Sequence, residues 1–143
     1  MITRRDEDSL KVGTVAKEAG VGVQTLHYYE RLGLLPKPRR SAANYRLYSP
    51  ETVRRVGFIK KAQAVGLTLE ETKQILDLKD HGRAPCHQVV ELGKKHLQEI
   101  DARLAQLRTF HRLLARSVSE WGKDDRPGRV CAGEFCDLIE RLP

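Results

Sequence analysis

Three cysteines are the residues of this sequence best suited to chemistry: Cys86, Cys131 and Cys136. An odd count argues against a framework of disulfides, so we expect free thiols. A lone cysteine is often just a small buried apolar side chain, but none of these three falls within a periodic apolar run. Three thiolates form a soft ligand set, which selects soft or borderline metal ions. The sequence therefore predicts a heavy-metal site for Hg(II) first, or for Pb(II), Cd(II) or Zn(II).

The same thiols leave two points open. Zinc sites usually have a fourth ligand, and either His87, which adjoins Cys86, or a water molecule would have to supply it. A thiol-based redox switch that uses no metal is the alternative role for these cysteines.

Between the first cysteine and the other two, apolar residues recur at alternating spacings of three and four over about four heptads, which is typical of a coiled coil. This pattern predicts a dimerisation helix over residues 88–121. A helix of this kind without a partner would expose a large apolar patch, so we expect a helix from a second chain to cover it. Folding back onto the N-terminal half is the alternative. The predicted interface consists of Val90, Leu97, Ile100, Leu104, Leu107, His111, Leu114, Val118 and Trp121.

The length of this helix separates the cysteines. A helix from Val90 to Trp121 would be about 48 Å long. The stretch from Trp121 to Cys131 reaches at most about 35 Å, so one chain cannot easily bring its own three cysteines together. An antiparallel pair of helices would instead place Cys86 of one chain beside Cys131 and Cys136 of its partner.

Basic residues are concentrated in the N-terminal half of the chain. From Arg31 to Lys61 there are nine Lys or Arg residues against one acidic residue, Glu51, while the net charge of the chain is +7. Such a concentration is the electrostatic footprint expected of contacts with nucleic-acid phosphates. A solvated basic surface is the alternative.

The patterns around this basic region predict a helix-turn-helix unit and a wing. Two short helices, over residues 12–19 and 23–32, are separated by Gly20 and closed by Gly33, which is typical of a helix-turn-helix. Residues 36–48 begin with two prolines and end in an alternating pattern, which predicts a basic hairpin.

Two more helices follow. Ser49 as N-cap, with Pro50 at the first helical position, predicts a helix to about residue 65. Thr68 and Glu71 predict a capping box for a helix to about Leu78. Residues 135–142 can form one or two helical turns.

The expected fold is mainly α. A winged helix-turn-helix DNA-binding domain spans residues 10–78, and a linker loop over 79–87 carries the first cysteine. A long antiparallel coiled-coil dimerisation helix follows over 88–121. A C-terminal metal-binding loop and short helix complete the chain over 122–143.

Residues 10–78 resemble the MerR family of winged helix-turn-helix regulators. The resemblance rests on four stretches. The first two are Val12-Gly13 with Val15-Ala16 and Gly20-Val21, and Thr25-Leu26-His27-Tyr28-Tyr29-Glu30-Arg31 with Gly33-Leu34-Leu35. The other two are Asn44-Tyr45-Arg46 with Tyr48, and Phe58-Ile59-Lys60-Lys61-Ala62-Gln63 with Gly66, Thr68, Leu69 and Glu71. A loop cysteine, a long helix and a cysteine loop follow in the order of the family's heavy-metal-sensing branch.

The resemblance implies a homodimer on promoter DNA, with the metal site across the dimer interface. It also implies that the metal-bound dimer distorts the DNA so that RNA polymerase can start transcription. Two positions depart from the pattern. Family members usually carry arginine where this chain has His27, and similar mercury sensors have a loop cysteine where this chain has Trp121.

The DNA contacts can be assigned to residue types. A helix in the major groove reads base edges with its first exposed residues, here Gln24, Thr25 and Tyr28. Of the adjacent Tyr28 and Tyr29, one is expected to face the DNA and the other to pack. Basic residues around the helix are expected to meet phosphates, which position the protein without reading sequence. The full predicted set is Gln24, Thr25, His27, Tyr28, Arg31, Arg39, Arg40, Tyr45, Arg46 and Lys60.

Several classes of protein fit the sequence poorly. It has no Gly-rich phosphate loop, no paired carboxylates in an apolar setting and no Ser/His/Asp constellation, so we expect neither an enzyme nor an organic cofactor. An iron–sulfur regulator of the same fold is also a poor fit, because such a cluster typically needs four cysteines and this chain has three. The sequence has no run of about 18 apolar residues, so we expect no membrane partner. The polar N-terminus does not look like a secretion signal, so a cytoplasmic location is expected.

Overall fold

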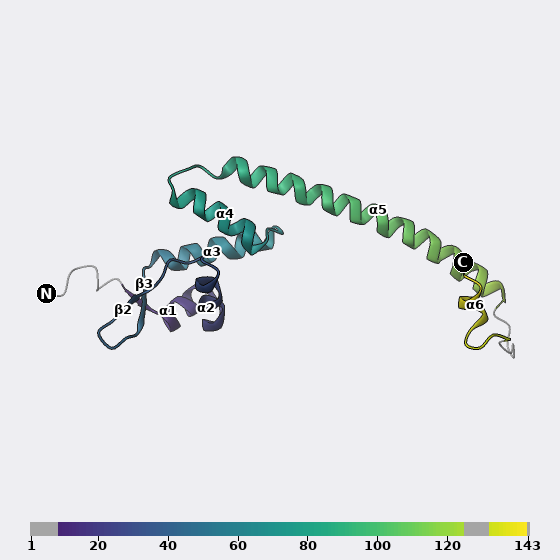
Figure 1. The fold of residues 1–143 in the computed structure, drawn as a ribbon, viewed down its shortest axis with the longest axis horizontal. Coiled ribbons are helices and arrows are strands. Elements are labelled where there is room, and N and C mark those ends of the chain that lie inside the picture. The colour runs from purple at the N-terminus through teal and green to yellow at the C-terminus, as the bar shows by residue number, and fades with distance from the viewer. Residues whose placement is uncertain (1–8, 125–131, 143) are drawn as a thin grey trace. The chain divides into compact units, whose positions relative to one another are not determined.

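The computed structural model describes residues 9–124 and 132–142, and these residues are mainly helical (Figure 1). They divide into two compact units, one up to His96 and one from Leu97 onward. The elements follow in the order β1 (Leu10–Lys11), α1 (Val12–Ala19), α2 (Val23–Arg31), β2 (Arg39–Arg40), β3 (Arg46–Tyr48), α3 (Glu51–Ala64), α4 (Leu69–Asp80), α5 (Cys86–Asp124) and α6 (Asp137–Glu140). The mainly α fold with a winged helix-turn-helix and a long helix is therefore confirmed.

The helix-turn-helix is built around one glycine. Gly20 ends α1 in the left-handed conformation, at φ 64° and ψ 44°, which a residue without a Cβ adopts at no steric cost. The amide of Val21 then donates to the carbonyl of Ala16 at 3.0 Å, and this bond turns the chain towards α2. The short α1 and α2 gain their stability from packing together, because helices of this length are marginal alone.

One core holds α1, α2 and α3. Fully buried leucine, isoleucine and valine side chains supply it, and each contributes about 1.5–3 kcal/mol by leaving water. They are Val15, Leu26, Leu34, Val56 and Ile59.

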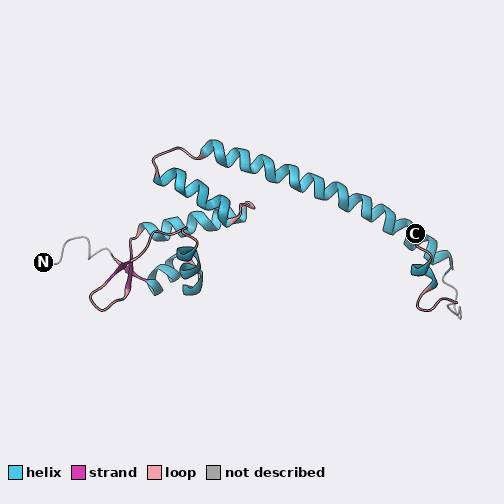
Figure 2. Cartoon of the chain, in the orientation of Figure 1, coloured by secondary structure: helices cyan, strands magenta, loops and turns pink. Residues whose placement is uncertain are grey.

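The wing is a three-stranded antiparallel sheet in the order β1-β3-β2, drawn in magenta in Figure 2. Arg40 pairs with Arg46 where β2 meets β3, and Asn44 turns the hairpin between them at φ 64°. The hairpin matches the sequence prediction. Strand β1 was not predicted, because two residues are too few to show an alternating pattern.

Helices α3 and α4 follow the wing. Helix α3 begins at Glu51, one residue later than predicted, since Pro50 rather than Ser49 is its N-cap. The capping box of α4 is confirmed: Glu71 N donates to Thr68 Oγ1 at 3.1 Å, and Thr68 N donates to Glu71 Oε2 at 2.9 Å. These bonds satisfy two amides that a helix start would otherwise leave without partners.

Helix α5 has 39 residues and begins earlier than predicted. Cys86 is its first residue, so the predicted position of this cysteine in a loop was wrong. The prediction failed because the apolar seam that marks the helix starts one turn later, at Val90. None of the helices in the described parts of the chain is both long and apolar enough to cross a membrane.

The first turns of α5 are anchored on α3 and α4. Leu92 joins Ala62, Leu67 and Ile75 in a second buried cluster. His96 Nε2 lies 2.8 Å from Glu71 Oε2, the same oxygen that accepts the Thr68 amide. Accepting hydrogen bonds, first from the Thr68 backbone and then from His96, lowers the pKa of Glu71 and keeps it ionised.

Candidate DNA-binding head and cysteine sites

Helix α2 presents part of the predicted reading surface to solvent. Gln24 is exposed, and Tyr28 is 44% exposed with the guanidinium of Arg31 5.8 Å from its ring centroid. Thr25 is half-buried. Tyr29 packs in the core, and its hydroxyl donates to Gln63 Oε1 at 3.0 Å. Of the two adjacent tyrosines, Tyr28 is therefore the one able to meet DNA.

The wing carries a second exposed group. Arg39, Arg40 and Tyr45 are all exposed, and Tyr45 shows 67% of its surface. Arg40 Nη1 donates to the backbone oxygen of Asn44 at 3.0 Å, which holds this arginine along the hairpin turn. A basic hairpin beside an exposed helix is an arrangement that can meet phosphates on either side of a groove.

Three residues of the predicted DNA-binding set have unexpected surroundings. His27 is half-buried, and its Nε2 is buried without a hydrogen-bond partner among the described residues. Lys60 Nζ donates to the carbonyl oxygens of Ala19 and Gly20 at 3.1 and 3.2 Å, so this lysine caps the end of α1. The structure thus gives Lys60 a role in holding the helix-turn-helix, while its contact with phosphate stays a prediction.

Arg46 is the third of these residues. Its Nε lies 3.5 Å from Glu30 Oε2, and its side chain is 38% exposed against 13% for Glu30. The hydroxyl of buried Tyr48 donates to the other oxygen, Glu30 Oε1. Burial of Tyr48, and then its hydrogen bond to Glu30, raises the pKa of the tyrosine, so it remains a donor.

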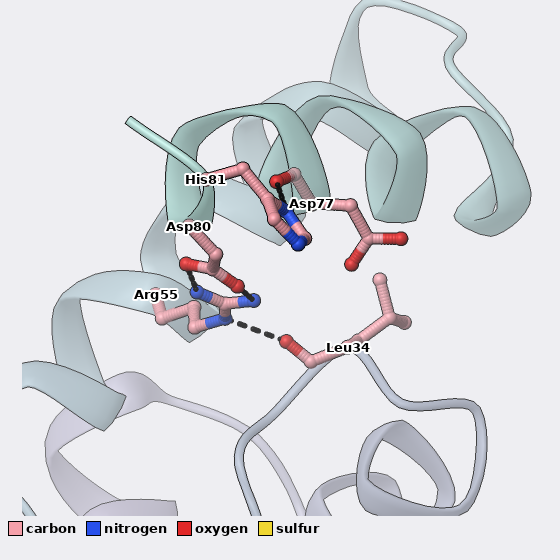
Figure 3. Close-up of polar contacts among 5 residues, drawn as sticks. All are labelled: Leu34, Arg55, Asp77, Asp80 and His81. Carbon is pink, nitrogen blue, oxygen red and sulfur yellow. Dashed lines mark hydrogen bonds and ion pairs between the residues drawn. The ribbon is translucent and has the colours of Figure 1, made fainter. Parts of the chain in front are cut away.

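A clamp that the sequence did not predict ties the segment that follows α2 to α3 and α4 (Figure 3). Arg55, on α3, donates from Nε to the carbonyl oxygen of Leu34 at 2.7 Å. Its Nη1 and Nη2 donate to both oxygens of Asp80 at 2.7 and 2.8 Å. Parallel Arg–carboxylate bonds of this kind fix orientation as well as distance. The clamp therefore sets where the segment lies that follows α2, which we call the reading helix because its exposed residues are predicted to contact base edges.

Replacing Arg55 by methionine should lower the free energy of unfolding by about 1–3 kcal/mol at neutral pH, because the carbonyl of buried Leu34 loses its donor. Hydrogen bonds from Arg55 lower the pKa of Asp80 below its ordinary value of 3.8. The stability that this carboxylate adds is therefore present at neutral pH and is lost as pH falls through the lowered pKa. Urea unfolding of the full chain from pH 7 to pH 3 measures both effects.

Arg54→Met is the matched control, since Arg54 is exposed on the same helix. It should leave the unfolding curve unchanged. An Arg55→Met protein with wild-type stability and wild-type acid sensitivity would show that the clamp contributes nothing.

The predicted dimer stripe on α5 is open to solvent in the single chain. Leu97 and Leu107 are each 63% exposed, and Trp121 is half-buried. Sequence reasoning left out two neighbours, Phe110 and Leu113, which are 62% and 57% exposed. The remaining stripe positions are also exposed: Val90, Ile100, Leu104, His111, Leu114 and Val118. Apolar exposure on this scale marks an interaction surface.

The cysteines lie at the two ends of this helix in the sequence. Cys86 is exposed and unbridged at the start of α5, and Cys136, half-buried, is the N-cap of α6. Cys131 lies outside the described residues. Within the described ranges, no three His, Cys, Asp or Glu side chains gather as they would around a metal ion.

Comparisons with known proteins agree with this architecture. Residues 10–79 match the family model for MerR HTH family regulatory proteins, and residues 53–116 match a model described as MerR, DNA binding. The chain is 36% identical over 104 residues to a mercuric resistance operon regulatory protein of Bacillus cereus, covering 73% of this chain and 79% of that protein. The chain belongs to the MerR family.

Two solved structures extend the likeness to 92% of this chain. The lead(II) complex of the transcription regulator PbrR691 from Ralstonia metallidurans CH34 is 30% identical, with a TM-score of 0.73, over 92% of this chain and 97% of that one. The mercury(II) complex of the regulator MerR from Bacillus megaterium MB1 is 27% identical, with a TM-score of 0.58 and the same coverage. This chain is thus a DNA-binding MerR-family transcriptional regulator of the metal-sensing branch, and not an enzyme.

In this MerR-family chain, two carboxylates organise the residues just before Cys136, and sequence reasoning missed both. Asp137, which is 7% exposed, accepts the amides of Ala132, at 3.0 Å, and of Gly133. Glu140 Oε1 accepts the amide of Phe135 at 3.0 Å. A methyl group on Gly133 would collide with both carboxylates, so a larger residue here would displace at least that of Glu140. Acidic residues in the first turn of a helix after a cysteine were the available signal.

Proposed function

We propose that this regulator binds promoter DNA as a homodimer and responds to a soft divalent metal ion bound by cysteines. Helix α2 enters the major groove, and the wing meets the flanking phosphates. The predicted DNA contacts are Gln24, Thr25, His27, Tyr28, Arg31, Arg39, Arg40, Tyr45, Arg46 and Lys60. The exposure of Gln24 and Tyr28 on α2, beside exposed arginines on β2, supports this assignment.

The proposed metal site lies between the two protomers, with Cys86 of one protomer and Cys131 and Cys136 of the other. The observation that carries it is the position of Cys86, exposed at the start of a 39-residue helix whose apolar stripe is open. At about 1.5 Å per residue, such a helix separates its ends by roughly 57 Å. An antiparallel partner brings the opposite ends of the two chains together.

The donor set fits a heavy-metal ion. Three thiolates are soft, so Hg(II) is the first choice and Pb(II), Cd(II) and Zn(II) follow. Relatives of this chain are named for mercuric resistance or were solved with lead(II) or mercury(II) bound, which supports the same class of effector. The bound ion would supply a bridge between protomers through metal–thiolate bonds.

We further propose that metal binding activates transcription through DNA shape. The dimer occupies the promoter with or without metal, and the metal-bound state favours a distorted DNA that RNA polymerase can use. Metal must stabilise that state over the other, since a ligand with equal affinity for both shifts nothing. Bending a DNA site of about 20–30 base pairs costs on the order of 1–6 kcal/mol, which an ion held by three thiolates can offset.

A thiol redox switch is the second candidate. The exposure of the free thiol of Cys86 favours it. Peroxide would then change DNA-dependent transcription at low metal, whereas a metal sensor responds to metal in the reduced state.

Titration of the reduced dimer with Hg(II), Pb(II), Cd(II), Zn(II) and Cu(I) in a competing thiol buffer tests the metal site. We expect thiolate charge-transfer absorption with the preferred ion. Cys86→Ser and Cys136→Ser should each abolish that band and the metal-induced transcription, while DNA affinity changes less than about threefold, because the thiols lie outside the DNA-binding surface. A full metal response in either variant, or a response to peroxide with no metal band, would refute the metal site.

A further inference from the structure

Glu30 joins the reading helix to the wing. It lies on α2, and both of its carboxylate oxygens meet side chains of β3: Oε1 accepts the Tyr48 hydroxyl, and Oε2 lies 3.5 Å from Arg46 Nε. Its side chain is 13% exposed, and Tyr48 is 2% exposed. A carboxylate this far from water is costly unless it is paired.

The pairing does not by itself explain why a charge lies here. A buried ion pair usually adds little stability over an apolar pair of the same size, because desolvation offsets the attraction. Fixing one arrangement of the groups around it is another role that such a pair can have. The arrangement fixed at Glu30 is that of one arginine of the wing relative to the reading helix.

The guanidinium of Arg46 has donors on more than one edge, and Glu30 faces its Nε edge. Across residues 9–124 and 132–142, no hydrogen bond from its two Nη groups is found. The side chain is 38% exposed. One edge of the guanidinium is therefore held while the rest can meet an anion.

We infer that Glu30 is a positioning residue for DNA binding: it holds Arg46 by one edge, so that the other nitrogens are pre-oriented towards a backbone phosphate at a fixed distance from the reading helix. This inference rests on the proposed contact of Arg46 with DNA. Pre-orientation strengthens binding because less side-chain freedom is lost when the contact forms.

Charge alone predicts the opposite effect of removing Glu30. Taking a negative charge from a surface that faces phosphates should strengthen binding to any duplex. The variant Glu30→Gln separates the positioning explanation from the charge explanation. Its amide oxygen can still accept the Tyr48 hydroxyl, but the amide has no charge to hold Arg46. Positioning predicts weaker binding, and a charge effect predicts tighter binding.

The experiment measures affinity of the full chain for a near-palindromic duplex selected by the wild-type protein from a random pool, over a range of salt. The proteins are wild type, Glu30→Gln, Arg46→Ala, the double variant and Tyr48→Phe. We expect Arg46→Ala and Glu30→Gln each to weaken binding about tenfold, within the range of coupled neighbours. The double variant should bind no more weakly than Arg46→Ala alone.

The salt dependence adds an independent measurement. Arg46→Ala should reduce the slope of log affinity against log salt by about one, as the loss of one phosphate contact does. Tyr48→Phe leaves the carboxylate on Arg46 and should keep both the slope and most of the affinity. If Glu30→Gln fails to fold, Glu30→Asp replaces it, because the shorter side chain keeps the charge but withdraws from Arg46.

The outcomes are distinct. The inference would be overturned if Glu30→Gln bound DNA more tightly than the wild type. It would also be overturned if Glu30→Gln lowered the DNA affinity by the same factor whether residue 46 is arginine or alanine. In both cases the proposed contact of Arg46 with DNA would stand. No effect of Arg46→Ala would overturn it by removing the residue through which Glu30 acts. Failure of the wild-type chain to select any duplex would refute the proposed function itself.

Discussion

Leu104→Glu is expected to convert the proposed dimer into monomer or unfolded chain. Leu104 lies midway between Val90 and Val118, the first and last apolar aliphatic positions of the predicted stripe, and is 44% exposed in the single chain. In a two-fold antiparallel pair, the midpoint of one helix meets the midpoint of the other, so two glutamates would face each other. An unpaired charge in a desolvated interface costs several kcal/mol, and about 4 kcal/mol weakens the dimer roughly a thousandfold.

Sedimentation velocity at micromolar concentration measures this change. Ala102→Glu is the control, because Ala102 is exposed and lies about 200° around the helix from Leu104. That variant should remain a dimer. A Leu104→Glu protein that sediments like the wild type would show that the stripe of α5 is not the dimer interface.

A heterodimer with Cys86→Ser in one chain and Cys136→Ser in the other is expected to bind close to one metal ion with high affinity. In the crossed arrangement, both substitutions fall in the same site, and the second site keeps all three thiols. If each chain formed its own site, both sites would be damaged and strong binding would be lost.

Placing both substitutions in one chain, opposite a wild-type partner, reverses the expectation. Each crossed site then loses one thiol, so no strong site remains, whereas sites formed within one chain would leave one intact. Metal titration of the two purified heterodimers, followed by thiolate absorption, compares them directly. One strong site in the second heterodimer and none in the first would exclude a site shared between protomers.

The helices of the DNA-binding domain could be predicted because their sequence signals are local. Gly20 between two short apolar patterns, and Thr68 three residues before Glu71, each mark a helix end within one turn of sequence. The stripe of α5 could be predicted for the same reason, since its period is repeated along the helix.

The side-chain contacts that hold the DNA-binding elements in place could not be predicted from such local signals. Arg55 and Asp80 are 25 residues apart, and nothing near either residue indicates the other. A basic residue on an exposed helix face can meet either a phosphate or a carbonyl of the same protein. Composition does not distinguish these partners, which is why Lys60 was assigned to DNA although it also caps α1.

The oxygen shared by Thr68 and His96 has a consequence for how this regulator can be observed. Glu71 Oε2 closes the start of α4 and meets α5 at the same time, so a displacement of α5 that draws His96 away also disturbs that helix start. Opening of a helix end exposes its amides to exchange with solvent deuterium. The exchange rate at Thr68 therefore reports the position of the first turns of α5, ten residues beyond the thiol of Cys86, with no label attached to the protein.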